Sequence, residues 1–216
     1  MFGPLDKATI RSIDFNRTSR CMLQDMREET WGWVVYRTTY RSDPAFHKAI
    51  EILTSWIKAG VYEDLNEYGL ENPDPTPNDQ LWARHQLTVI EEGGTLDGAS
   101  LDIVRGHFEG WVKAQDKQDT WNKYRACLVI DEAAVQRLGE AMTPEEHQEK
   151  HGERRYTELR QWFLPAVEAF LELEEGETDF EGWMNCSVFN LIRLWTSLDD
   201  GMYMEDASNE VQDGVY

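Results

Sequence analysis

Alternating and periodic apolar positions along the chain predict a protein that mixes helices and strands. The ten residues 31–40, WGWVVYRTTY, are almost all aromatic, β-branched or Thr, and such residues favour the pleated backbone. Both faces of this expected strand carry bulky side chains, which is typical of a strand covered on both sides. Arg37 is the exception, because a charge on a covered strand must reach solvent, a carboxylate or a ligand. We therefore expect a central strand with one polar position that needs a partner.

Helical spacing of apolar residues predicts a helix from Asp43 to Gly60, with Asp43 as its cap and Pro44 in its first turn. Thr143 and Glu146 form a capping box that starts another helix. The remaining expected helices are 95–115, a short helix capped by Asp131, 154–175 with a bend at Pro165, and 191–198. The remaining expected strands are 124–130, 182–188 and a short strand at 87–90 within the extended stretch 82–92. The prolines within 62–79 predict a loop there.

The resulting order β-α-β-α-β-α-α-β-α predicts a layered α+β domain. The closest simple scheme is a ferredoxin-like four-stranded sheet with a helical layer, in which the 95–115 helix is an insertion and the last helix an addition. A parallel α/β sheet is the competing topology. We expect an N-terminal arm at 1–29, a single domain at 30–198, and an acidic, loosely docked tail at 199–216.

Charge and cysteine content narrow the setting of the protein. The chain has 41 acidic and 21 basic residues and a formal net charge of −20, which disfavours binding to nucleic acid or to an anionic membrane. It contains three widely separated cysteines and lacks both a signal-like apolar start and an apolar run that would span a bilayer. These features predict a soluble, intracellular, cytoplasmic protein.

Four short stretches resemble motifs of a group of uncharacterised filamentous-fungal proteins. They are GWVVYRTTY at 32–40, LDGAS at 96–100 followed by FEGW at 108–111, CLVIDE at 127–132, and GWM at 182–184. The resemblance spans most of the chain, and it implies one domain and a fungal origin. It supplies no activity.

The polar positions on otherwise apolar strands are the candidate ligand-binding residues. They are Arg37, His85, Arg125 and Asn185, with Tyr36 adding a hydroxyl. If they converge, His85 would act as acid or base and Arg37 would hold the charge of a small anionic or carbonyl-bearing ligand, so that His85, Arg37 and Tyr36 are the catalytic candidates. The competing interpretation pairs Arg37 with one of the many acids and leaves His85 near a strand end in water.

The sequence predicts no metal site and no cofactor. His147 and His151 stand at i and i+4, a spacing that would let them share a metal, but a third ligand is not apparent and a solvated helix explains the pair. Cys127 lies in an apolar strand and is expected to be a small core residue.

Two hypotheses about function follow. The first is a binding protein without chemistry of its own, acting by self-association or on a protein partner. Core packing is the first explanation of the nine tryptophans, but Trp31, Trp121, Trp162 and Trp183 would form an interface if several of them are exposed. The second is a small-molecule enzyme or ligand carrier with a pocket between sheet and helices.

Overall fold

The structure is a computed structural model that describes residues 17–65, 73–118, 121–151, 159–171, 180–199, 202–209 and 214–216. Its centre is a five-stranded mixed sheet with the order β2-β1-β3-β4-β5. The strands are β1 (Val34–Arg37), β2 (Thr88–Ile90), β3 (Ala126–Ile130), β4 (Phe163–Glu168) and β5 (Trp183–Ser187). β1 is parallel to both β2 and β3, whereas β4 is antiparallel to β3 and to β5.

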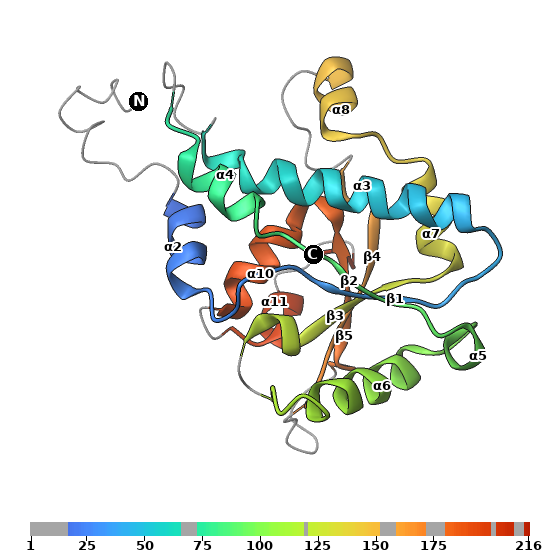
Figure 1. Cartoon of the computed structure of the whole chain (residues 1–216). Coiled ribbons are helices and arrows are strands. Elements are labelled where there is room, and N and C mark those ends of the chain that lie inside the picture. Colours follow the sequence, from blue (N-terminus) through green and yellow to red (C-terminus); the bar gives the residue numbers. More distant parts are fainter. Residues whose placement is uncertain are drawn as a thin grey trace.

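Helices lie on both faces of this sheet (Figure 1). The longer ones are α2 (Arg17–Asp25), α3 (Asp43–Val61), α6 (Leu101–Lys113), α7 (Glu132–Gly139), α8 (Pro144–His151) and α10 (Leu191–Asp199). The shorter ones are α4 (Thr76–Trp82), α5 (Gly93–Leu96) and α11 (Met204–Asn209). In Figure 1, α3 runs along one face of the parallel strands and α6 along the other.

The sheet confirms an α+β protein but differs from the ferredoxin-like scheme. That scheme has four strands, and the structure has five in one open mixed sheet. The parallel alternative describes only the part formed by β2, β1 and β3. The fifth strand is β4, which lies inside the segment expected to be the 154–175 helix.

The expected helix with a bend at Pro165 is therefore wrong for residues 163–168, and the ends of that segment lie outside the described residues. The apolar run FLPAVE also fits a strand, since its last five residues are buried between two neighbours. Pro165 is tolerated because the β3–β4 pairing stops at Leu128 and Ala166, so its missing N–H interrupts no bond to β3.

Several local signals are confirmed. Thr143 and Glu146 bond reciprocally through their side chains and backbone N–H groups at the start of α8, and Asp131 caps α7 by accepting from Ala134 N. At α3 the cap is Ser42, whose hydroxyl accepts from Ala45 N, so the cap lies one residue earlier than expected. Part of the expected Pro-rich loop forms α4 instead.

The core fills both sides of the central strand. Trp33, Val34, Val35 and Tyr36 are all fully buried. Trp33 packs edge-on against Trp195 of α10, whereas Tyr36 packs against Phe108 of α6. Because successive residues of a strand point to opposite faces, Trp33, Val35 and Arg37 face α3 and α10, and Val34 and Tyr36 face α6.

The described part of the 199–216 tail is docked. Met204 and Ala207 of α11 are fully buried, contrary to the expectation of a loose segment. Val215 forms a parallel bridge with Asn185 of β5, and Ser187 N and Tyr216 N donate to Tyr216 O and Asn185 O respectively. The outer side of β5 is thus paired with residues 215–216.

Candidate functional site

The carboxyl ends of β1 and β3 form a topological switch point. β1 leads through α3 to β2 on one side, and β2 leads back through α6 to β3 on the other. In open sheets of this kind, ligands bind outside the carboxyl ends of the strands at the switch point. Thr38 N donates to Ile130 O, and Gly98 N donates to Thr38 O, so three loops meet here.

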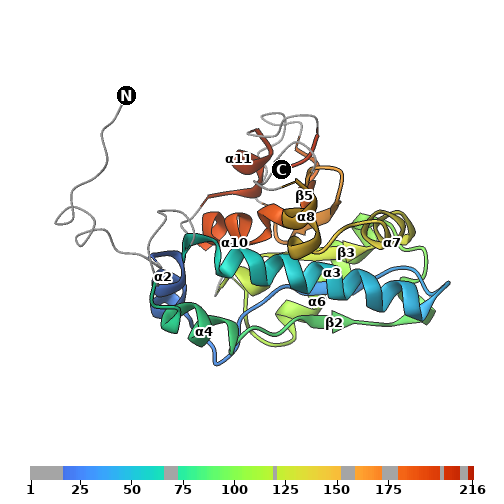
Figure 2. The same ribbon diagram turned by 90° about the horizontal axis from the view of Figure 1, so that it is seen from above.

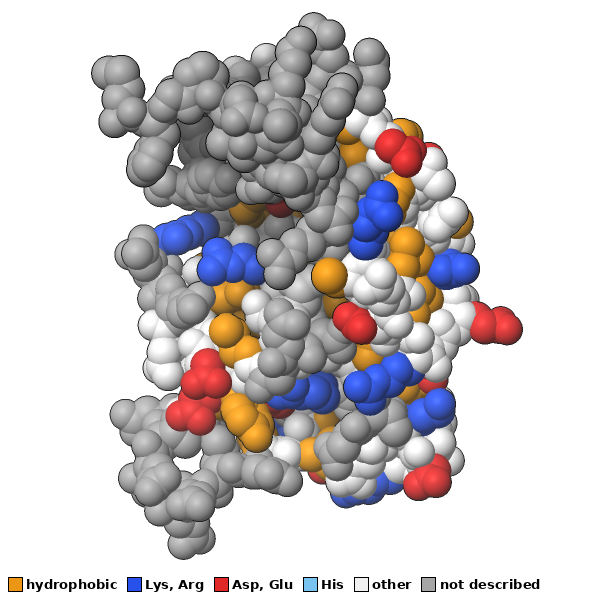
Figure 3. All heavy atoms as spheres, turned by 90° about the vertical axis from the view of Figure 1, so that its left-hand side faces the viewer, with side chains coloured by type: hydrophobic (Ala, Val, Ile, Leu, Met, Phe, Trp, Pro, Cys, Tyr) orange, Lys and Arg blue, Asp and Glu red, His pale blue; other side chains and the backbone are white. Residues whose placement is uncertain are grey.

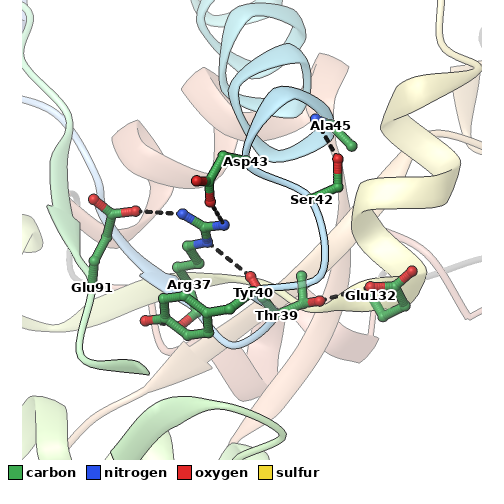
Figure 4. Close-up of polar contacts among 8 residues, drawn as sticks. All are labelled: Arg37, Thr39, Tyr40, Ser42, Asp43, Ala45, Glu91 and Glu132. Atoms are coloured by element: carbon green, nitrogen blue, oxygen red, sulfur yellow. Dashed lines mark hydrogen bonds and ion pairs between the residues drawn. The ribbon is translucent and has the colours of Figure 1, made fainter. Parts of the chain in front are cut away.

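Polar side chains from four elements meet at this edge of the sheet (Figure 4). We call them the carboxyl-edge cluster, which consists of Arg37, Thr39, Tyr40, Asp43, Glu91 and Glu132. Arg37 ends β1, Asp43 lies in the first turn of α3, and Glu132 lies in the first turn of α7. Glu91 follows β2 directly.

Arg37 is the centre of the cluster, and each of its three guanidinium nitrogens donates a hydrogen bond. Nε donates to Thr39 O at 2.8 Å, Nη1 to Glu91 Oε1 at 2.9 Å and Nη2 to Asp43 Oδ1 at 2.5 Å. The guanidinium also lies over the rings of Tyr40 and Phe46, at 4.5 and 4.4 Å from their centroids. Arg37 therefore links β1 to α3 and to the residue that follows β2. The partners that its charge needs are Asp43 and Glu91.

The carboxylates of the cluster remain open to water while Arg37 does not. The Arg37 side chain is 5% exposed, against 71% for Asp43 and 46% for Glu91. Burial disfavours the charge of Arg37, but the hydrogen bonds to Asp43 and Glu91 outweigh it and raise the Arg37 pKa. The same hydrogen bond lowers the pKa of Asp43. Arg37 and Asp43 are therefore both charged at neutral pH.

Glu132 is the carboxylate of the cluster that lies in the first turn of α7, after β3. Thr39 Oγ1 donates to its Oε2 at 2.6 Å, and this bond lowers the Glu132 pKa. Arg41 Nε approaches the same oxygen at 3.9 Å, but its side chain is 78% exposed, so this ion pair is weak. Glu132 thus presents a fixed negative charge beside the loop that follows β1.

A second series of hydrogen bonds lies on the other face of the same strands. Tyr36 O–H lies 2.9 Å from His107 Nδ1, and His107 Nε2 lies 3.3 Å from Glu92 Oε2. Because a carboxylate only accepts, Nε2–H donates to Glu92 and Nδ1 accepts from the Tyr36 hydroxyl. Burial, with added effects of Cys127 and Glu92, raises the pKa of Tyr36, so its hydroxyl stays protonated. These two hydrogen bonds link α6 to β1 and to the loop that follows β2.

The sequence-predicted residues lie in separate places. Tyr36 and Arg37 point to opposite faces of the sheet, as their partners on α6 and α3 show. His85 and Arg125 precede β2 and β3 and therefore lie at the amino ends of these strands, away from Arg37. Asn185 lies on β5 and pairs through its backbone with residues 215–216. These residues therefore do not meet in one place, and they do not line the common pocket that was expected.

His85 is enclosed by aromatic rings. It stacks on Trp82 at 4.7 Å and meets Trp31 edge-on at 4.8 Å. Among the described residues its buried Nε2 has no hydrogen-bond partner, and burial lowers its pKa to about 4. The imidazole is therefore neutral at pH 7, and it lies just before β2 with its side chain half-buried.

Arg125 is held by carbonyls and one buried acid. Nη1 donates to Leu198 O at 2.8 Å, and Nη2 donates to Met202 O at 3.1 Å and to Glu168 Oε1 at 3.2 Å. Burial raises the pKa of Glu168 although Arg125 opposes the shift. These bonds tie the α10–α11 segment to β3 and β4.

The amino-end surface differs in charge from the chain as a whole. Figure 3 shows Lys and Arg side chains spread over the face at the left of Figure 1, between apolar patches. Arg84 precedes β2, and Lys117 and Lys123 precede β3, where both lysines pair with Glu28 at 3.0 and 3.9 Å. The acidic residues that follow β2 and β3 lie at the opposite ends of these strands.

The burial of Cys127 and His147 tests two further predictions from the sequence. Cys127 is fully buried, as predicted, and burial raises the pKa values of the Cys127 and Cys186 thiols. His147 is buried against Trp56 and Trp162 and lies beside His151, so its helix face is not solvated. Within the described ranges, no group of three or more His, Cys, Asp or Glu residues is placed to hold a metal ion.

Core packing, the first explanation of the tryptophans, holds for three of the four that were considered for an interface. Trp31, Trp121 and Trp162 are buried, and only Trp183 is partly exposed. Trp31, Trp33 and Trp121 all pack edge-on against Trp195, at 5.6, 5.1 and 5.7 Å. Among the described helices, none is both long and apolar enough to cross a membrane.

Comparison with known proteins gave no relative. The chain matches no family model, no curated protein and no solved structure. Function is therefore argued from the geometry of the carboxyl-edge cluster.

Proposed function

We propose that the protein acts by binding, without chemistry of its own, and that it takes up a small cationic molecule at the carboxyl-edge cluster. The observation that carries this proposal is the division of charge in the cluster. Its guanidinium is buried and bonded through all three nitrogens, whereas Asp43 and Glu91 keep 71% and 46% of their side chains exposed. What the cluster offers to solvent is therefore negative charge.

The carboxylates are held on rigid elements, which favours recognition of a defined ligand. Glu91 is fixed at the end of β2 by Arg37, and Glu132 is fixed in the first turn of α7 by Thr39. An amine or guanidine would receive charge-assisted hydrogen bonds from such oxygens without first ordering them. The net charge of −20 would also raise the local concentration of cations.

The titratable groups support binding over catalysis. A nucleophile needs a lowered pKa or an adjacent base, and the pKa values of the Cys127 and Cys186 thiols and of Tyr36 are all raised by burial. His85, the expected acid or base, touches aromatic rings and has a buried nitrogen without a partner in the described part of the chain. The proposed site lies at the strand ends and not between sheet and helices.

Isothermal titration calorimetry with matched small molecules tests the proposal. Putrescine and agmatine serve as cationic probes, and succinate serves as an anion of similar length. We expect the cations to bind and succinate not to bind. Glu132→Gln and Glu91→Gln should each weaken cation binding, by roughly 5-fold, because each removes one charge-assisted acceptor.

Glu145→Gln is the matched control. Glu145 is an exposed acid of α8 outside the cluster, and its change removes the same charge from the chain. It should leave cation binding unchanged. Equal weakening by Glu145→Gln and Glu132→Gln would mean that the cations respond only to net charge, and the proposal would then fail.

A further inference from the structure

β2 forms an open edge of the sheet. Among the described strands, which lie in the order β2-β1-β3-β4-β5, β2 has β1 as its single neighbour, whereas residues 215–216 pair with Asn185 and Ser187 on the outer side of β5. Figure 2 shows β2 at the outer margin of the molecule. Val89, at the middle of β2, is 36% exposed and is one of the few large apolar residues in the described ranges that are so exposed.

The backbone of this edge has groups directed outward. Gln86 N donates to Trp31 O and Thr88 N donates to Trp33 O, so Gln86, Thr88 and Ile90 face β1. Because a strand alternates, the N–H and C=O groups of Leu87 and Val89 point away from the sheet. No strand among the described residues pairs with them. They form a template for one more strand.

We propose that the β2 edge binds the β2 edge of a second copy of this chain in an antiparallel arrangement. This inference does not rest on the cationic ligand proposed above. It rests on the charges that flank β2, which are opposite at its two ends: Arg84 precedes the strand, and Glu91 and Glu92 follow it. An antiparallel pair brings unlike ends together, whereas a parallel pair would bring like ends together.

The register follows from the same residues. If Leu87 pairs with Val89 of the second copy, the two-fold axis passes between the two copies of Thr88. Leu87 and Val89 both have outward backbone groups, so these pairs exchange N–H···O bonds and place two apolar side chains together. Arg84 then stands opposite Glu92, and His85 stands opposite Glu91. Shifting the register by one residue sets outward-facing residues opposite Thr88 and its inward-facing neighbours, so the N–H···O bonds between the copies are lost.

The partner strand is β2 of another copy, because two antiparallel copies of this edge place opposite charges and apolar side chains against one another. Short edge strands flanked by charge normally resist association, since the flanking charges repel. Here the flanking charges of an antiparallel pair attract. The net charge of −20 opposes dimerisation at long range, but at 150 mM salt the Debye length is about 8 Å, so contact pairs outlast that repulsion.

Sedimentation velocity over a concentration series at 150 mM salt tests the inference. We expect a reversible monomer–dimer equilibrium for the unmodified chain. Arg84→Glu and Glu92→Arg should each weaken the dimer, by roughly 10-fold, because each places like charges opposite one another. The double variant R84E/E92R reverses both charges and should restore the affinity of the unmodified chain.

Val89→Pro tests the backbone directly. Proline removes the outward N–H of Val89 without removing a bond to β1, and it should abolish dimerisation. Val89→Lys, which puts a like-charged pair near the axis and keeps the backbone, serves if the proline variant does not fold by circular dichroism. A chain that stays monomeric at all concentrations overturns the inference, as does a dimer that Val89→Lys and the charge reversals leave unchanged. Cation binding measured on the same variants remains a separate test of the carboxyl-edge cluster.

Discussion

The two ends of the parallel strands hold buried charge in opposite ways. At the carboxyl end, the buried group is Arg37, and its acidic partners are exposed. At the amino end, Arg125 is 24% exposed, and its partner Glu168 is the more buried, at 9%. A guanidinium cannot shed its proton in a protein, but a buried carboxyl can gain one. The buried charge of Arg37 at the carboxyl end is therefore independent of pH, whereas the buried charge of Glu168 at the amino end depends on pH.

The largest expected effect comes from Arg125→Met. The change leaves Glu168 buried without its cation and removes donors from the carbonyls of Leu198 and Met202. Breaking a buried pair from one side is strongly destabilising, so we expect a loss of about 3 kcal/mol in the free energy of unfolding at pH 7. Urea denaturation measures it.

Acid should reduce that loss. Glu168 has a raised pKa in the folded state, so the folded chain binds more protons than the unfolded chain between pH 4.5 and the raised value. Stability of the Arg125→Met variant relative to the unmodified chain should rise as the pH falls through this window. A loss that is constant from pH 7 to 4.5 would contradict the comparison.

His85 gives the next effect, with the opposite sign. Its pKa is about 4 in the folded chain and 6.5 when unfolded, so the unfolded chain binds more protons between these values. Stability from the neutral imidazole is complete above pH 6.5 and is lost as the pH falls toward 4, by about 3 kcal/mol. His85→Phe keeps the ring contacts with Trp31 and Trp82 and should flatten this part of the stability–pH curve.

Arg37→Met sharpens the comparison. Arg37 is more buried than Arg125, so burial alone would predict the larger loss at Arg37. Its partners Asp43 and Glu91 are exposed and can return to water, so we expect a smaller loss of about 1.5 kcal/mol, mainly from the Thr39 carbonyl and from packing. Parallel urea denaturation of the two Met variants decides the order.

The smallest expected effect is that of Tyr36→Phe. The change removes the hydroxyl that donates to His107 Nδ1 and leaves the ring contacts with α6 in place. A net loss of about 1 kcal/mol is typical of one hydrogen bond. His107→Ala combined with Tyr36→Phe should cost less than the sum of the two single changes, which a double-mutant cycle measures.

Local signals in the sequence predicted much of the fold. The caps at Asp131 and Thr143 and the β-branched runs of β1 and β3 each fix an element from a few neighbouring residues. β4 was missed because residues 163–168 become a strand through pairing with β3 and β5, which are distant in sequence. Helical spacing in 154–175 therefore indicated the wrong element.

The site was predicted only in part, for a related reason. The need of Arg37 for a carboxylate partner was legible, but Asp43 and Glu91 could be chosen only once the neighbours of β1 were known. The expected convergence with His85 and Arg125 ignored position along the strand. Residues that precede parallel strands and residues that end them lie at opposite edges of the sheet, and that signal was present in the sequence. No pattern in the sequence indicated that His107 would contact Tyr36 and Glu92.

The bridge between Asn185 and Val215 limits how far association along the sheet can extend. A subunit with two adhesive edges can add a neighbour on each side and grow into a filament of unlimited length. With the β5 edge already occupied from within the chain, pairing through β2 uses the remaining strand edge in the described sheet. In the proposed dimer, residues 215–216 would thus act as a chain terminator in the sense of polymer chemistry, because they cover the Asn185–Ser187 part of the β5 edge.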